Sequence, residues 1–194
     1  MTPLRPLWII DPSVSCPESQ GVQQILAGWP GPSRLFQPVL VPGDGPDSRS
    51  GYDAAGVVLM GSAASVHDRL PWMQALSEWL RPIVDGERDL PLLGICFGHQ
   101  LLAHLAGASV EFLDERKSKR LGVETTRLDR SRLLPGVDEL RVVVSHREIV
   151  CNVPAGFRGV AARAGVVRQV TILSAVSGSC FQCPNKASRG MGSL

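Results

Sequence analysis

The chain has 194 residues, 44% hydrophobic and 20% charged, which is enough for one globular domain with a sizeable core and too few for two full catalytic domains. Its net charge of +2 and scattered arginines give no electrostatic reason to expect nucleic acid or an anionic membrane as a partner. No apolar run approaches the roughly 20 residues of a membrane span and the N-terminus does not resemble a signal peptide, so we expect a cytoplasmic protein.

Apolar runs and helical patterns alternate in the first half of the chain. Short apolar runs bounded by turn residues predict strands, and amphipathic spacing predicts helices between them. This alternation is typical of an α/β fold, with a mainly parallel open sheet covered by helices on both faces in the flavodoxin-like manner. In chain order we expect strand 7–11, helix 18–29, strands 36–41 and 54–60, helix 72–83, strand 90–95 and helix 97–105.

The second half lacks long helical patterns and ends irregularly. Residues 121–126, 140–145, 158–162 and 166–173 resemble strands, and 150–157 resembles a turn-rich loop. From Ser174 onward the sequence has no usable period. We therefore predict one domain over residues 1–173, incomplete at its C-terminal end, and an irregular, poorly ordered tail over residues 174–194.

The five cysteines do not form a recognisable framework. Their number is odd and their spacing is wide, which argues against a set of structural disulfides. Cys180 and Cys183 have C-x-x-C spacing, but no second ligand pair accompanies them, and Pro184 follows where a redox motif would open a helix. We interpret that spacing as incidental and expect neither a metal nor a cofactor.

The most informative segment is Gly94-Ile95-Cys96-Phe97-Gly98-His99-Gln100, where a buried-type strand leads directly into a helix. Glycines on both sides of Cys96 allow a sharp turn that presents the thiol to a substrate. A cysteine at a helix N-terminus is favoured as a thiolate by the partial positive charge there. Gly61 and Ser62 follow another predicted strand, so they should lie at the same edge of the sheet as Cys96.

These segments resemble the class I (triad-type) glutamine amidotransferases, and most of all the glutaminase domain of GMP synthase and its stand-alone relatives. The nucleophile segment carries the resemblance, joined by the glycine-rich stretch 59–66 and by Ser145-His146-Arg147-Glu148. It extends over roughly residues 7–167. The resemblance implies the fold of that family and glutamine as the substrate. An ammonia-accepting synthase subunit is implied as a partner, because no nucleotide-activating module is apparent.

The resemblance also implies a role for each matching residue. Cys96 would attack the side-chain amide of glutamine and form a glutamyl thioester, which water hydrolyses to glutamate. The N–H of Phe97 and one near Gly61 or Ser62 would form the oxyanion hole. Gln100 would bind the glutamine, as would His146 on the substrate side.

The base of the expected triad is not found where the resemblance places it. Members of this family carry a late His-Pro-Glu segment, whereas this sequence has no histidine after His146. His67 reads as a loop residue, and His99 and His104 as helix residues behind the nucleophile. His146 and Glu148 are the substitute base pair, since residues two apart in an extended segment share a face.

Three readings therefore remain open. The chain is a glutaminase that uses Cys96; or it is a non-catalytic, truncated or frameshifted copy without the base, which acts as a binding partner; or it is a different cysteine hydrolase on a similar sheet. The ammonia acceptor and the oligomeric state are not specified by the sequence.

Overall fold

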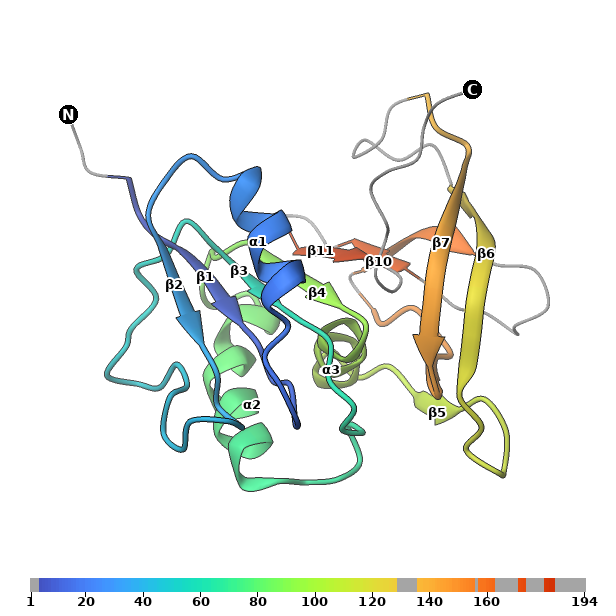
Figure 1. The fold of residues 1–194 in the computed structure, drawn as a ribbon, viewed down its shortest axis with the longest axis horizontal. Helices are drawn as coiled ribbons and strands as arrows, with labels where there is room; N and C mark the ends of the chain where they lie inside the picture. Colours follow the sequence, from blue (N-terminus) through green and yellow to red (C-terminus); the bar gives the residue numbers. More distant parts are fainter. Residues whose placement is uncertain (1–3, 129–135, 156, 163–170, 174–179, 184–194) are drawn as a thin grey trace.

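A parallel sheet of five strands forms the centre of the molecule. The computed structural model describes residues 4–128, 136–155, 157–162, 171–173 and 180–183. In spatial order the sheet is β11-β4-β3-β1-β2, and every neighbouring pair is parallel. The carboxyl ends of all five strands therefore lie at one edge (Figure 1): β1 (Leu7–Ile10), β2 (Ser33–Phe36), β3 (Gly56–Leu59), β4 (Leu92–Ile95) and β11 (Cys180–Cys183).

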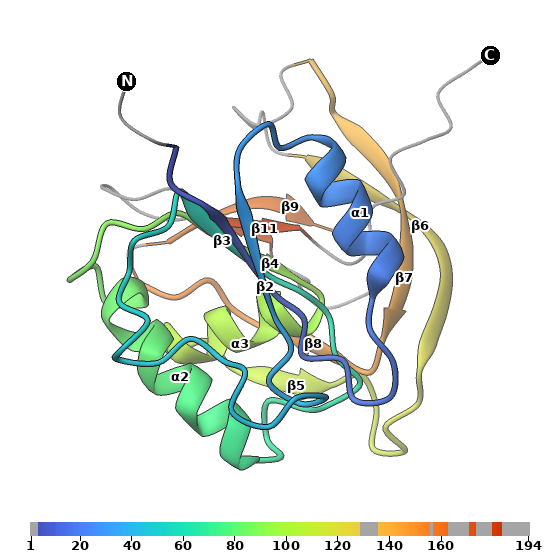
Figure 2. The same cartoon turned by 60° about the vertical axis from the view of Figure 1, so that its left-hand side comes forward.

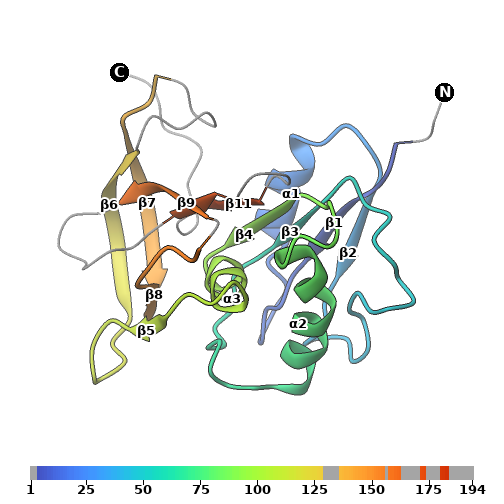
Figure 3. The ribbon, with the colours of Figure 1, turned by 180° about the vertical axis from the view of Figure 1, so that it is seen from behind.

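Helices cover both faces of this sheet because alternate residues of each central strand point to opposite sides. Ile9 and Val58 pack with Val22 of α1 (Ser19–Ala27) on one face. Trp8 and Leu59 pack on the other face against α2 (Pro71–Val84) and α3 (Phe97–Leu105). The view from behind shows α2 and α3 together on their face (Figure 3). With both faces covered, β1 and β3 are almost continuously apolar.

Antiparallel strands from the second half of the chain stand beside the parallel sheet, as Figures 1 and 2 show. Two strands, β6 (Arg120–Leu128) and β7 (Glu139–His146), form a long ladder, and β9 (Arg158–Ala162) and β10 (Thr171–Leu173) extend it. A two-stranded sheet joins β5 (Val110–Phe112) to β8 (Glu148–Val150). Residues 110–112 and 148–150 had no predicted strand, because three-residue strands are too short for a sequence period.

The predicted α/β fold with a mainly parallel sheet and helices on both faces is confirmed. The second strand was predicted in the wrong place: residues 33–36 form it, and Gln37 to Val41 turn away, with the Val41 N–H donating to the Gln37 carbonyl at 2.9 Å. The four-residue partner β1 limits how far this strand extends.

The predicted irregular tail contains a regular element. Residues 180–183 are a strand that pairs along the open edge of β4, where unpaired backbone groups favour an additional strand. Residues 174–179 and 184–194 lie outside the described residues, as does most of the predicted strand 166–173, so the division at residue 173 stays a prediction. In the described part of the chain, no helix has the length and apolar character needed to cross a membrane.

Candidate active site

Cys96 sits on a strained turn between β4 and α3. Its backbone has φ 53° and ψ −108°, a conformation that non-glycine residues rarely adopt and that persists only when the surroundings enforce it. Neighbouring glycines permit that turn. A Cβ on Gly98 would lie 2.1 Å from the Leu59 carbonyl oxygen, and one on Gly94 would lie 2.7 Å from the His99 nitrogen. The predicted sharp strand-to-helix turn is therefore present, with Cys96 at the N-terminus of α3, and its role as nucleophile stays a prediction.

The glycine-rich loop after β3 lies next to this turn. A Cβ on Gly61 would be 3.4 Å from the Cys96 Cβ, so the two strand ends are in close contact. Ser62 Oγ donates to the Pro12 carbonyl at 2.7 Å and accepts from the Ala64 N–H at 3.1 Å. The Ser62 hydroxyl therefore ties this loop to the end of β1. The oxyanion-hole role stays a prediction for Gly61, Ser62 and Phe97, the first residue of α3.

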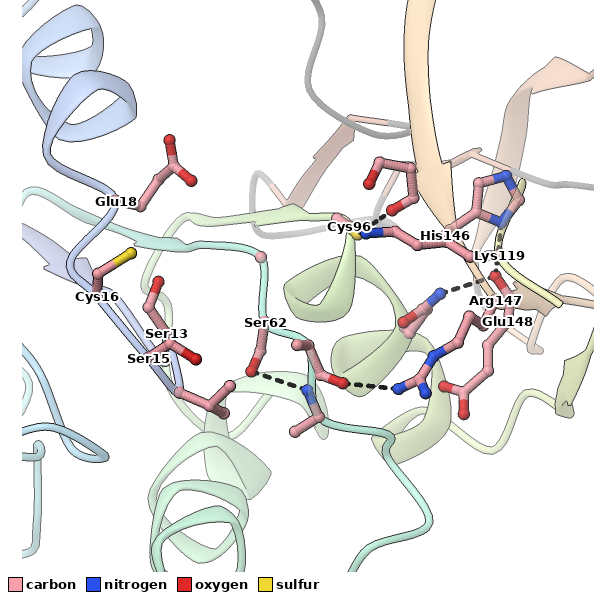
Figure 4. A pocket seen from close by; sticks show the side chains of 16 residues that line it. Ser13, Ser15, Cys16, Glu18, Ser62, Cys96, Lys119, His146, Arg147 and Glu148 are labelled. Atoms are coloured by element: carbon pink, nitrogen blue, oxygen red, sulfur yellow. Dashed lines mark hydrogen bonds between the residues drawn. The ribbon is translucent and has the colours of Figure 1, made fainter. Parts of the chain in front are cut away.

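One cavity of about 470 Å³ brings most of the predicted site residues together. That volume lies within the range of about 300–1,000 Å³ typical of small-ligand sites. Gly61, Ser62, Cys96, Gln100, His146 and Glu148 all line it. Phe97 does not, since its side chain is buried against Trp72. Figure 4 shows Cys96 in the upper centre and Ser13, Ser15, Cys16 and Glu18 to its left.

Gln100 and His146 meet at the backbone of Glu148. Gln100 Nε2 donates to the Glu148 carbonyl at 2.8 Å, and His146 Nδ1 lies 3.0 Å from the same oxygen. A carbonyl only accepts, so Nδ1 carries the proton of the second bond. His146 therefore contacts the backbone carbonyl of Glu148 and not the carboxylate that the predicted base pair would use, and the base role of the two residues stays a prediction. The carboxylate points elsewhere.

The Glu148 carboxylate accepts a hydrogen bond from Ser65 Oγ, and both side chains are buried. The adjacent Arg147 donates from Nη2 to the Ala63 carbonyl at 2.7 Å. Two side chains of the β7–β8 junction thus hold the loop that follows β3, and Figure 4 draws the Arg147 bond. Ser65 was not singled out by the sequence, since no local signal indicates a partner 83 residues away.

Asp11 organises the far wall of the cavity. This fully buried carboxylate accepts from Ser13 Oγ at 2.5 Å and from the Glu18 N–H at 2.8 Å. It thereby fixes the segment 13–18, in which exposed Cys16 also lines the cavity. Sequence reasoning identified Asp11 only as the end of a strand. The Asp-Pro step after a buried strand was the available signal.

The other histidines lie away from the cavity lining. His67 Nε2 is 2.9 Å from the Val110 carbonyl, and its ring centroid is 6.1 Å from that of His104. Desolvation lowers the pKa of His104 below its usual range, and the positive charges of His67 and Arg81 add to this. His99 is buried within α3. Their predicted loop and helix positions are as observed.

The strand next to β4 brings a C-terminal residue close to the nucleophile. In the β11–β4 register, Cys183 is opposite Ile95, the residue before Cys96. The described strand β11, Cys180-Phe181-Gln182-Cys183, contains no histidine.

Comparison with known proteins agrees with this geometry. The model of the family "Glutamine amidotransferase class-I" matches residues 33–172, well over half of the chain. The chain belongs to the class-I glutamine amidotransferase family. The matched region includes the turn at Cys96, the loop after β3 and the β7–β8 junction.

Among curated relatives, this amidotransferase chain is similar to glutamine-hydrolyzing GMP synthases. It is 38% identical over 117 residues to that of Porphyromonas gingivalis, covering 60% of this chain and 21% of the relative. It is 42% identical over 77 residues to that of Streptococcus thermophilus, covering 39% and 15%. The matched region thus spans 21% of the length of the first relative and 15% of the second.

Solved structures with the same fold include other amidotransferases. A glutamine amido transferase from Methylobacillus flagellatus superposes with a TM-score of 0.65 at 26% identity, covering 83% of this chain and 62% of that one. A glutamine amidotransferase from Thermotoga maritima gives 0.69 at 17% identity, covering 90% and 74%. At 17% identity, the likeness to the Thermotoga maritima protein shows the fold alone.

Proposed function

We propose that this chain hydrolyses glutamine to glutamate and ammonia through a thioester on Cys96. The observation that carries the proposal is the shared cavity: the strained Cys96 turn, the Gly61–Ser62 loop and Gln100 line one space at the carboxyl edge of a parallel sheet. Ligands of open α/β sheets bind at this edge. Membership of the amidotransferase family supports glutamine over other amides.

The proposed chemistry begins at the thiolate of Cys96. The sulfur bonds to the side-chain amide carbon, and the amide oxygen becomes an oxyanion. Backbone N–H groups of Phe97 and of the Gly61–Ser62 loop stabilise that oxyanion, each contributing about 3–4 kcal/mol by analogy with measured oxyanion donors. The C–N bond then breaks as the nitrogen takes up from solvent a proton equivalent to the one that the thiol released, and ammonia leaves. Water adds to the thioester carbon, the C–S bond breaks, and the products are glutamate and the restored thiol.

Gln100 and His146 shape the substrate side of the cavity in this proposal. Both side chains donate to the Glu148 carbonyl, so their positions are coupled. A substrate that contacts one of them therefore has the other at a fixed distance. His146 with Glu148 is also the proposed substitute base pair. In that role the Glu148 carbonyl, bonded to Nδ1, orients the imidazole.

The ammonia is proposed to pass to a synthase carried by another chain or another segment. Support comes from the GMP synthase relatives, in which the matched region is about a fifth of the length. A separate synthase subunit is the corresponding partner here.

The test is release of glutamate from glutamine by the purified protein, alone and with the remaining part of a glutamine-hydrolyzing GMP synthase as the candidate synthase. Cys96→Ala is expected to abolish release, whereas Cys16→Ala, which alters another cysteine of the same cavity, should retain most of it. A His146→Ala variant with wild-type release would remove His146 from the proposed base pair. No release by the wild type in either condition contradicts the proposed function and favours a non-catalytic role.

A further inference from the structure

A lysine from outside the nucleophile motif and the glycine-rich loop reaches into the cavity. Lys119 lines the same space as Cys96. In Figure 4 its side chain extends across the cavity toward Cys96 from the side of the antiparallel sheet. It immediately precedes β6 in the sequence. A cation beside a nucleophilic sulfur changes the chemistry of that sulfur.

The β6–β7 ladder places Lys119 at this position. In its register Arg120 is opposite His146 and Leu121 is opposite Ser145. The Ser145 carbonyl oxygen lies 3.8 Å from the Cys96 sulfur. The start of β6 is thus beside the end of β7 that contacts the nucleophile. Pairing of two strands therefore brings Lys119 to the site.

A tight turn anchors the other side of Lys119. The Ser118 N–H donates to Asp114 Oδ1 at 2.9 Å, and the Lys117 N–H donates to the Asp114 carbonyl at 3.0 Å. The Ser118 N–H is the main reason why the pKa of the Asp114 carboxyl is below its usual range. An ionised Asp114 therefore holds the turn in place at neutral pH, directly before Lys119.

The arginines near Lys119 are engaged in contacts of their own. Arg147 donates to the Ala63 carbonyl, and Arg120 pairs with Glu124 outside the cavity. Among the described residues, Lys119 has no carboxylate within ion-pair distance. The titratable and charged side chains that line the cavity with Cys96 are Cys16, Glu18, Lys119, His146, Arg147 and Glu148.

We propose that the ammonium group of Lys119 holds Cys96 as a thiolate in the resting site. The thiol proton is released to solvent, and the positive charge stabilises the anion that remains. The N-terminus of α3 acts in the same direction. A preformed thiolate needs no separate base to remove its proton before it attacks an amide.

The direct test measures the pH dependence of Cys96 alkylation by iodoacetamide, followed by mass spectrometry of the Cys96 peptide. Thiolates react and thiols do not, so the midpoint reports ionisation of the sulfur. Lys119→Met is expected to raise the midpoint by about one pH unit. At pH values below the midpoint, this shift corresponds to a roughly tenfold lower fraction of thiolate. Lys119→Arg retains the charge and should retain the midpoint.

Lys117→Met is the matched control on the same loop. Lys117 lies 4.4 Å from the centroid of the Phe112 ring and does not line the cavity, so this change should leave the midpoint at Cys96 unaltered. Cys151, a free cysteine that does not line the cavity, serves as a second thiol within each sample. A wild-type midpoint in Lys119→Met overturns the proposal, and so does an equal shift at Cys151 and Cys96.

This assay needs no glutamine, so its outcome is independent of the proposed glutaminase reaction. One consequence does rest on that reaction: Lys119→Met should lower kcat/KM for glutamine about tenfold below the midpoint and recover at high pH. Shifted alkylation without any glutamine hydrolysis would support the Lys119 role and contradict the glutaminase proposal.

Discussion

Ser65 donates its hydroxyl hydrogen to the Glu148 carboxylate and joins the loop after β3 to the start of β8, 83 residues away in the sequence. Both side chains are buried. The same hydroxyl oxygen accepts the His67 N–H at 3.1 Å, and the Glu148 carbonyl on the other side receives Gln100 and His146. One hydrogen-bonded link therefore connects the loop after β3 to the residues that line the proposed substrate side of the cavity.

Removing this hydroxyl should destabilise the protein. Ser65→Ala leaves a buried carboxylate oxygen without its donor, and such a loss costs about 1–3 kcal/mol in the free energy of unfolding. Urea unfolding followed by circular dichroism measures that change. The substitution should also raise KM for glutamine, because Gln100 and His146 are positioned through Glu148.

Ser109→Ala is the matched control for this prediction. Ser109 Oγ donates to Glu111 Oε1 at 2.9 Å, so it forms the same serine–carboxylate hydrogen bond at an exposed position. Water replaces the lost donor there, and the free energy of unfolding should change by less than about 0.5 kcal/mol. Equal losses in the two variants would show that burial of Ser65 and Glu148 does not determine the effect.

Among the described glycines, Gly98 is the one where an added methyl group should reduce the stability of the fold most. A Cβ there would lie 2.1 Å from the Leu59 carbonyl oxygen, and backbone atoms cannot move aside as a flexible side chain can. Gly98→Ala must push α3 away from β3, and we expect it to lower the free energy of unfolding by roughly 3 kcal/mol or more.

Gly28→Ala provides the comparison for that variant. Gly28 has φ −93°, and its added Cβ would be 3.6 Å from the nearest atom, the Ile25 carbonyl oxygen. Its urea midpoint should stay close to that of the wild type. A Gly98→Ala protein as stable as Gly28→Ala would mean that α3 does not need to approach β3 so closely.

Predictable parts of the fold are those whose signals are local. β1, β3 and β4 are short apolar runs that end at turn residues, and the nucleophile turn is marked by Gly94 and Gly98 within a few residues of Cys96. By contrast, β8 has only three residues, and it forms because Val110–Phe112 pairs with it. Such pairing depends on the tertiary structure and leaves no period in the sequence.

The residues of the candidate site also divide into those with a local sequence signal and those placed only by the tertiary structure. Cys96 and Gln100 belong to one motif and were predicted from it, and His146 was predicted from the resemblance of its segment and from its spacing to Glu148. Lys119 lacked any such signal, because only the β6–β7 register brings it to the cavity. The strand at Cys180–Cys183 was missed because its own residues favour no element; the open edge of β4 supplies its hydrogen-bond partners.

Cys151 offers a pH-dependent prediction away from the cavity. Burial raises the pKa of its thiol above the ordinary value, and the negative charge of Glu111 raises it further. A raised thiol pKa means that the reactive thiolate appears only at higher pH, so Cys151 should be alkylated by iodoacetamide more slowly than exposed Cys16 at neutral pH. Peptide mass spectrometry resolves the two sites.

Glu111→Gln should lower the Cys151 midpoint toward that of an ordinary thiol, because it removes the neighbouring negative charge and leaves burial unchanged. Exposed Glu115 is the control: Glu115→Gln changes the net charge equally, but Glu115 is not among the groups that raise the pKa of Cys151, so the Cys151 midpoint should match the wild type. Since burial is the larger cause, the midpoint in Glu111→Gln should still remain above that of Cys16. A midpoint that falls all the way to the Cys16 value would mean that Glu111, and not desolvation, dominates the chemistry of this thiol.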